Sequence, residues 1–188
     1  MKMLVVMQVL TMLPKDKIEF VMRENYGRVM NLISNKMIKY VKGDATSPQG
    51  DGKKVIAHIC NDIGGWGAGF VLALSKKWMH PENVYRANYK LGLVLGDIQI
   101  ATVEHDIVVI NMIAQSGTIS RLKDENLPPI RYEALERCLE KVNQYCVTYN
   151  ATLHAPRFGA GLAGGDWNKI EKIIESTMSV PVTIYDFN

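Results

Sequence analysis

The sequence predicts an α/β fold, a three-layer αβα sandwich built on a mixed central sheet. Two observations support this class. Apolar segments of strand length alternate with segments whose apolar residues recur at helical spacing, and two β-branched segments flank a short polar break at residues 104–106. The alternation predicts parallel strands with helices on both faces of the sheet, and the polar break predicts one antiparallel hairpin.

The expected strands have short apolar or alternating patterns that end at glycine, proline or polar residues. They cover residues 37–42, 55–60, 96–103, 107–113, 151–158 and 180–187. The expected helices carry an apolar stripe on one face. They cover residues 15–36, 70–78, 81–90, 130–150 and 166–178, the last with Asp166 as its N-cap.

Residues 37–188 are expected to form one domain, and residues 1–36 a partly helical N-terminal extension. The opening segment, "MKMLVVMQVLTMLP", resembles the core of a signal peptide, but no small-residue cleavage site follows its apolar run. The run is also too short to span a bilayer. The three cysteines are odd in number and lack metal-binding spacing, which favours reduced thiols, a cytoplasmic location and no metal site.

The net charge of +3 is mild, and the lysines and arginines are scattered along the chain. Such a distribution does not indicate direct nucleic-acid binding, whereas it is compatible with an anionic small ligand. The sequence therefore predicts neither a membrane nor a nucleic-acid partner.

Two glycine-rich segments each lie between an expected strand and an expected helix. The first glycine loop, residues 61–69, reads "NDIGGWGAG", and the second glycine loop, residues 159–165, reads "GAGLAGG". At such junctions backbone N–H groups and the positive end of the helix dipole converge, and glycine lets an anion approach the main chain. Two such loops in one domain predict a site that holds a diphosphate from both sides.

Other interpretations of the glycines are weaker. Gly159, Gly161 and Gly164 match the dinucleotide-binding pattern, with Asp186 after the next strand, but only two residues follow Asp186, too few for the further βαβ units of a Rossmann fold. Neither loop ends in Gly-Lys-Ser/Thr, which argues against a P-loop. Each loop could also be only a tight connection with close helix–sheet packing.

Four segments together resemble the macrodomain family, the ADP-ribose-binding fold. They read "YVKGD", "AHICNDIGGWGAGF", "PRFGAGLAGGDW" and "VTIYDF", and they occur in family order between residue 37 and the C-terminus. The first glycine loop looks most like the branch with ADP-ribose 1''-phosphate phosphatases and glutamate- and DNA-linked ADP-ribose glycohydrolases. The resemblance implies ADP-ribose or a close derivative as the ligand, with no cofactor and no metal.

The resemblance also implies ligand-binding positions. Asp44 would accept a hydrogen bond from the adenine amino group, and Tyr185 or Phe187 would stack on the base. The residues expected around the distal ribose and the diphosphate come from the two glycine loops and the loop after the hairpin. They are Asn61, Gly65, Trp66, Gly67, Ala68, Gly69, Gln115, Gly159, Ala160, Gly161, Leu162 and Ala163.

His58, Asn61 and Asp62 are the candidate catalytic residues, since each could lie near the distal ribose. Simpler alternatives stay open for several positions. His58 could be a hydrogen-bonded core residue, Trp66 could fill the edge of the core, and Asp44 could cap a turn.

The sequence departs from the glycohydrolase branch at two places. That branch uses a Lys after the second strand of the hairpin and an Asp in the second glycine loop, where this chain has Gln115 and Ala163. Gln115 cannot form a Schiff base with an opened ribose, and Ala163 cannot act as a carboxylate base. Lys123 is near in sequence, but nothing directs it toward the ligand.

Two functional classes therefore remain. The leading one is a hydrolase of ADP-ribose derivatives, such as the 1''-phosphate or an acetyl ester, and the other is a non-catalytic ADP-ribose reader. ADP-ribosylated macromolecules are a further class of partner that the resemblance implies. A Rossmann-type NAD-binding protein is the least favoured interpretation.

Overall fold

The computed structural model describes residues 38–118 and 127–186. The expectations for the extension at residues 1–36, for the domain start at Met37, and for Lys123 and Phe187 lie outside the described residues.

Six strands form one mixed sheet in the order β1-β6-β5-β2-β4-β3. They are β1 (Lys39–Lys42), β2 (Lys53–Asn61), β3 (Ile98–Thr102), β4 (Ile107–Gln115), β5 (Ala151–Pro156) and β6 (Val182–Asp186). All neighbours are parallel except β3 and β4, which are antiparallel. The mixed sheet and the hairpin are confirmed, and the strand order differs from that of a Rossmann fold.

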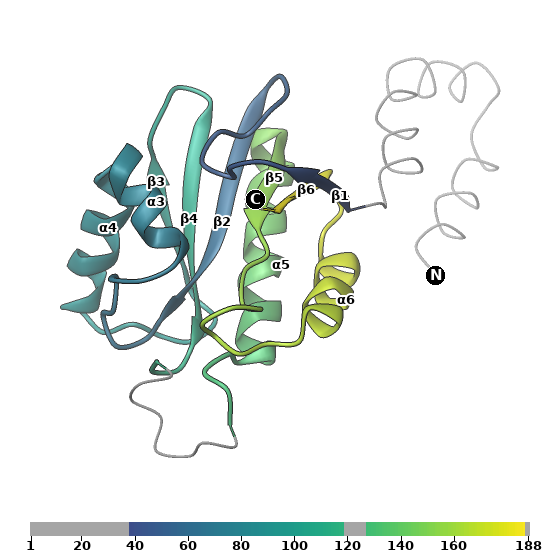
Figure 1. The fold of residues 1–188 in the computed structure, drawn as a ribbon. Coiled ribbons are helices and arrows are strands. Elements are labelled where there is room, and N and C mark those ends of the chain that lie inside the picture. The colour runs from purple at the N-terminus through teal and green to yellow at the C-terminus, as the bar shows by residue number, and fades with distance from the viewer. Residues whose placement is uncertain (1–37, 119–126, 187–188) are drawn as a thin grey trace, which may run out of the picture. The chain divides into compact units, whose positions relative to one another are not determined.

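Helices cover both faces of the sheet (Figure 1). On one face lie α3 (Phe70–Lys77) and α4 (His80–Tyr89), and on the other lie α5 (Tyr132–Tyr149) and α6 (Trp167–Thr177). The αβα sandwich is therefore confirmed. Among the helices of residues 38–118 and 127–186, none is long and apolar enough to cross a bilayer.

The central strand β2 explains the continuous apolar run "VIAHIC". Val55 and Ala57 pack into the core that includes α5 and α6, whereas Ile56 and Cys60 pack into the core that includes α3 and α4. A strand buried on both faces needs apolar residues at every position rather than at alternate ones. The strand therefore leads directly from the buried centre of the domain into the first glycine loop.

The last residues of β2 and β4 pair irregularly. Cys60 pairs with Ile113, but the next residue, Asn61, pairs with Gln115, so Ala114 is an extra residue on β4. Such a bulge turns the side chains beyond it away from the regular alternation of the strand. It brings Asn61 and Gln115 side by side where the sheet ends.

The helix expected at 130–150 begins later, at Tyr132. Ile130 instead forms an isolated antiparallel bridge with Gln115, and Arg131 is extended. The expected N-cap is confirmed, because the Asp166 carboxylate accepts the Asn168 N–H at the start of α6.

Candidate functional site

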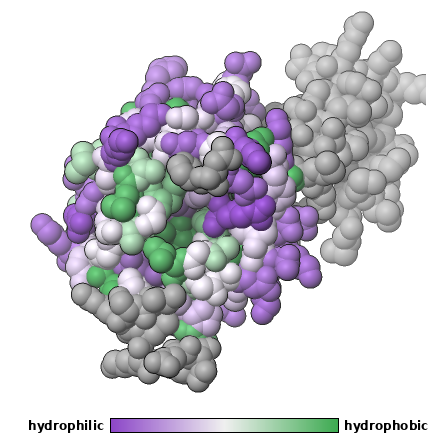
Figure 2. Space-filling model, in the orientation of Figure 1, coloured by the Kyte–Doolittle hydropathy of each residue, from purple (hydrophilic) through white to green (hydrophobic). Residues whose placement is uncertain are grey.

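A pocket of about 600 Å³ opens at the carboxyl ends of β2, β4 and β5, between the two glycine loops (Figure 2). Its volume lies in the usual range for small-molecule sites. The described residues that line it are His58, Ile59, Cys60, Asn61, Gly65, Gly67, Ala68, Gly69, Phe70, Val71, Gln115, Thr118, Pro156, Arg157, Phe158, Gly159, Gly161, Leu162 and Ala163. Most of the positions predicted around a diphosphate and its distal ribose are thus brought together.

Two glycines of this wall are not required by the fold. A Cβ built on Gly67 or Gly161 would meet no atom of the described protein within 4 Å, and neither residue has a positive φ. Gly159 is different, because its φ is +80° and a Cβ there would lie 2.9 Å from Ile130 Cδ1. Neither packing nor backbone conformation therefore requires glycine at Gly67 and Gly161, and their bare backbone leaves room for close approach of a ligand.

The two loops offer different anion-binding groups. The N-cap of α3 is Gly69, without a side-chain cap among the described residues, and Gly69, Phe70 and Val71 line the pocket. The free N–H groups and the positive dipole end of α3 are thus available to an anion. The N-terminus of α6 is capped by Asp166 and lies outside the wall, so the second loop can contribute only its own backbone.

Arg157 brings the permanent positive charge of the described wall. Its guanidinium lies 4.8 Å from the ring centroid of Tyr40 and 5.0 Å from that of Trp167, and its Nε lies 2.5 Å from Asp186 Oδ1. The ion pair lowers the pKa of Asp186. Stacking and pairing hold this cation at the start of the second glycine loop, where it can attract a diphosphate.

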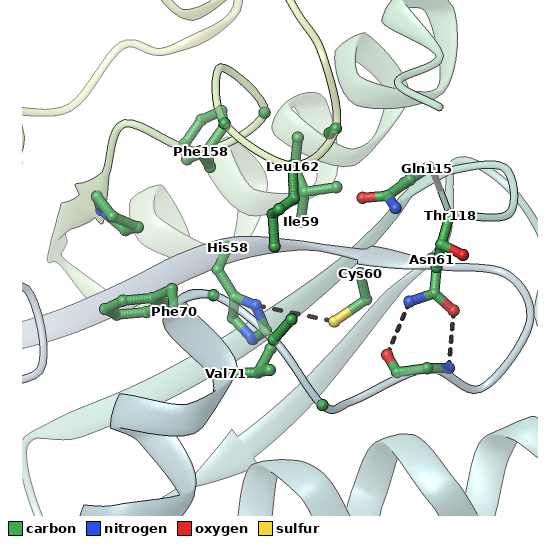
Figure 3. Close-up of a pocket in the computed structure, with 18 of the residues that line it drawn as sticks. His58, Ile59, Cys60, Asn61, Phe70, Val71, Gln115, Thr118, Phe158 and Leu162 are labelled. Carbon is green, nitrogen blue, oxygen red and sulfur yellow. Dashed lines mark hydrogen bonds between the residues drawn. The ribbon is translucent and has the colours of Figure 1, made fainter. Parts of the chain in front are cut away.

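The Asn61 side chain holds the first glycine loop in place (Figure 3). Its Oδ1 accepts the N–H groups of Ile63 at 3.1 Å and Gly65 at 2.8 Å, and its Nδ2 donates to the Gly65 carbonyl at 2.7 Å. Gly65 has no side chain because a Cβ would lie 2.9 Å from Asn61 Nδ2. Asn61 therefore shapes the loop as well as lining the pocket.

Asp62 lies just outside the pocket wall. Its Oδ1 accepts the Gly117 N–H at 2.7 Å, and its N–H donates to the Gln115 carbonyl at 2.9 Å. Gln115 in turn donates from Nε2 to the Gly117 carbonyl at 2.9 Å. Asp62 thus ties the loop after β4 to the loop after β2, while Gln115 keeps a side-chain oxygen for a hydroxyl or a water.

His58 lies in the floor of the pocket as a buried, neutral residue. Asn111 donates from Nδ2 to the Pro81 carbonyl, which turns its Oδ1 toward His58 Nε2 at 2.7 Å. Nε2 therefore carries the proton, and Nδ1 faces Cys60 Sγ at 3.8 Å. Burial lowers the pKa of His58 to about 4 and raises the pKa of the Cys60 thiol, so the pair stays uncharged.

The side chain of Trp66, within the first glycine loop, is buried in the interior and is not part of the pocket wall. It is 5% exposed, its indole N–H donates to Ser75 Oγ at 2.8 Å, and its ring packs on Tyr85 at 5.1 Å between centroids. Its position is that of a residue at the edge of the core. Ala160 is also not among the residues of the wall, although its neighbours Gly159 and Gly161 are.

Asp44 and Tyr185 lie at the ends of β1 and β6, beyond the pocket wall. The Asp44 carboxylate accepts the Thr46 N–H at 2.8 Å, and the Tyr185 hydroxyl accepts the Gln49 N–H at 2.9 Å. Tyr185 also contacts His154 Nδ1 at 3.0 Å. These bonds order the loop between β1 and β2 on the side of the pocket opposite to Asn61.

Several wall residues were not predicted from the sequence. Phe70 and Val71 belong to the first turn of α3, and Arg157 and Phe158 immediately precede the second glycine loop. Their adjacency to the loops was the available signal. The described residues contain no cluster of three potential metal ligands.

Comparison with known proteins identifies the family. No family model matches the chain. A Bacteroides thetaiotaomicron protein of unknown function has a solved structure with 51% identity and a TM-score of 0.76, covering 80% of this chain and 98% of that one. The macrodomain protein from Streptomyces coelicolor is 43% identical with a TM-score of 0.71, covering 81% of this chain and 100% of that one. This chain belongs to the macrodomain family.

Relatives of this macrodomain include proteins of very different length. The chain is 30% identical to chromodomain-helicase-DNA-binding protein 1-like of Mus musculus over 82% of its own length, but it spans only 18% of that protein. It is 27% identical to the ADP-ribose 1''-phosphate phosphatase of Candida albicans, covering 99% of that protein, and 27% identical to the ADP-ribose glycohydrolase OARD1 of Bos taurus, covering 90%. These names agree with the branch that the glycine loops resemble.

We expect the stability of the macrodomain to fall in mild acid. Burial lowers the pKa of both His58 and His154 from 6.5 to about 4. The unfolded chain takes up these protons near pH 6.5, so it binds more protons than the folded chain between pH 6.5 and 4. The free energy of unfolding is therefore highest, with respect to these two groups, above this window, and it decreases as the pH falls through the window.

Urea unfolding at pH values between about 4 and 8 measures this dependence. The His58→Asn variant should flatten the curve, because it removes one of the two buried histidines. A free energy of unfolding that does not change over the window would contradict the buried, neutral state of the two histidines.

Proposed function

We propose that this macrodomain binds ADP-ribose or a close derivative between its two glycine loops. The observation that carries the proposal is the bare backbone of Gly67 and Gly161, which the protein itself does not require and which faces the pocket. The uncapped N-terminus of α3 and the guanidinium of Arg157 supply N–H groups and positive charge for a diphosphate.

The strand order separates the positions that the resemblance assigns to the two ends of the ligand. Asp44 follows the outer strand β1, whereas Asn61 and Gln115 end β2 and β4, on the other side of β5 and the second glycine loop. Ligands of open α/β sheets lie across the carboxyl ends of the strands. With the orientation that the resemblance implies, the proposed ligand has its adenine near Asp44 and Tyr185, its diphosphate between the loops, and its distal ribose near Asn61 and Gln115.

The same proposal includes a cytoplasmic location and two forms of the ligand. Free ADP-ribose derivatives are the first form, and ADP-ribosylated macromolecules are the second. The exposed residues Gly67, Ala68 and Gly69 form the rim of the pocket, so the distal end of a bound ligand is close to solvent.

The Gly67→Glu variant tests binding directly. A carboxylate at this position would face the diphosphate, and juxtaposed like charges cost several kcal/mol, so affinity for ADP-ribose should fall by more than about 30-fold. Gly161→Val should also weaken binding by filling the pocket. Calorimetry with ADP-ribose measures both effects, and thermal unfolding should show little loss of stability because neither new Cβ meets the protein.

The control is Gln144→Glu, which adds the same charge on the exposed face of α5. It should bind as the unchanged chain does. If the Gly67→Glu and Gly161→Val variants both bound ADP-ribose as tightly as the unchanged chain, the proposed site would be refuted.

Hydrolysis at the distal ribose is the second function we propose. It is favoured by relatives that are named ADP-ribose 1''-phosphate phosphatase and are covered almost entirely by the match. In this reaction water adds to phosphorus and gives up a proton, the bond from phosphorus to the ribose oxygen breaks, and that oxygen takes up a proton to become a hydroxyl. Gln115, with its side-chain oxygen at the distal end, is the residue proposed to orient the water.

The described wall has no carboxylate, and His58 uses Nε2 as a donor to Asn111. A general base contributes about 10²–10⁴ to a rate, so hydrolysis here would rely on the phosphate oxygens of the substrate as proton acceptors and would be slow. By the resemblance, Gln115 and Ala163 stand where the glycohydrolase branch has a Lys and an Asp, and both residues line the pocket.

Phosphate release from ADP-ribose 1''-phosphate, and acetate release from the acetyl ester, measure this activity. The unchanged chain should exceed the Gly67→Glu variant, and Gln115→Ala should lower turnover by about tenfold while it changes binding less. If neither product appears although ADP-ribose binds, the hydrolase proposal fails and the non-catalytic reader is the function.

A further inference from the structure

Tyr85 lies on α4, behind the first glycine loop and outside the pocket wall. It is fully buried, and its hydroxyl lies 2.7 Å from the backbone oxygen of Asn61 and 2.9 Å from Asn61 Oδ1. Both acceptors belong to one residue, so the hydroxyl proton is shared between them. Burial raises the pKa of Tyr85, which keeps this group a donor at neutral pH.

The oxygen that Tyr85 contacts is the one that shapes the loop. Asn61 Oδ1 also accepts the N–H groups of Ile63 and Gly65. A side-chain amide can rotate and exchange its oxygen and nitrogen, and a loop with four glycines has many alternative conformations. A third donor, fixed on a helix, selects the orientation in which the oxygen faces the loop N–H groups.

A second contact from the same helix reaches the loop at Trp66. The Trp66 ring packs on Tyr85, and its indole N–H donates to Ser75 Oγ, which donates to Glu82 Oε2 at 2.7 Å. Glu82 lies one turn before Tyr85 on α4 and is also paired with Arg86. The helix therefore holds the loop at residues 61 and 66, on either side of the backbone groups of residues 63–65 that Asn61 binds.

We propose that Tyr85 is a positioning residue for ligand binding. Its hydroxyl fixes Asn61, Asn61 fixes residues 63–65, and the following residues 67–69 are thereby held against the diphosphate and the distal ribose. This inference rests on the proposed function and adds a residue that does not touch the ligand. The adenine side, at Asp44 and Tyr185, is held by separate bonds and is independent of Tyr85.

The Tyr85→Phe variant of the full chain tests the proposal, because it keeps the ring packing on Trp66 and removes only the hydroxyl. A lost hydrogen bond of ordinary strength should weaken ADP-ribose binding about 3- to 10-fold in calorimetry. Affinity for AMP, which lacks the second phosphate and the distal ribose, should change less than about twofold. Tyr145→Phe on α5 makes the same chemical change away from the pocket and should alter neither affinity.

Amide hydrogen exchange of the ligand-free protein provides a readout that does not depend on the ligand. In Tyr85→Phe the amides of residues 65–69 should exchange faster, while those of β2 and β4 should not. Unchanged exchange in the loop, equal weakening of both ligands, or unchanged ADP-ribose affinity would each overturn the proposal. Failure of the unchanged chain to bind ADP-ribose would instead refute the proposed function, and loop exchange would still decide whether Tyr85 positions Asn61.

Discussion

The site depends on the hydrogen bonds that the Asn61 side-chain amide makes with the first glycine loop. A bulge at the ends of β2 and β4 places this residue where the sheet stops. Its side-chain oxygen accepts the Gly65 N–H, and its nitrogen donates to the Gly65 carbonyl. The loop is glycine-rich and would otherwise lose much conformational entropy when a ligand orders it. The amide, held in place by the Tyr85 hydroxyl, orders the loop in the ligand-free protein. The conformational entropy is therefore lost during folding and not when the ligand binds.

Much of the architecture could be predicted because it depends on local patterns. Two strand–loop–helix junctions with glycines, a helix N-cap at Asp166 and a polar break in the hairpin are each encoded within a few residues. Parallel strands then bring their carboxyl ends to one edge of the sheet, so the two loops had to meet. The sheet supplies the proximity that no single loop sequence contains.

Other features depend on pairings between distant residues, which sequence patterns do not show. The bulge is a property of two strands in register, and the Tyr85 contact joins residues that are far apart along the chain. Trp66 is similar, since a Trp in a glycine loop can face either the ligand or the core. In this protein the indole N–H of Trp66 donates to Ser75 Oγ in the interior, and burial of the large apolar ring is favourable.

A crystal structure of the full chain with ADP-ribose would test the central claim, that a pre-ordered pair of loops holds the diphosphate. We expect diphosphate oxygens within hydrogen-bonding distance of the N–H groups at the start of α3 and of residues 160–162. Asn61 should keep its hydrogen bonds to Gly65 in the complex. A diphosphate bound outside the two loops, or an Asn61 side chain turned away from Gly65, would contradict it.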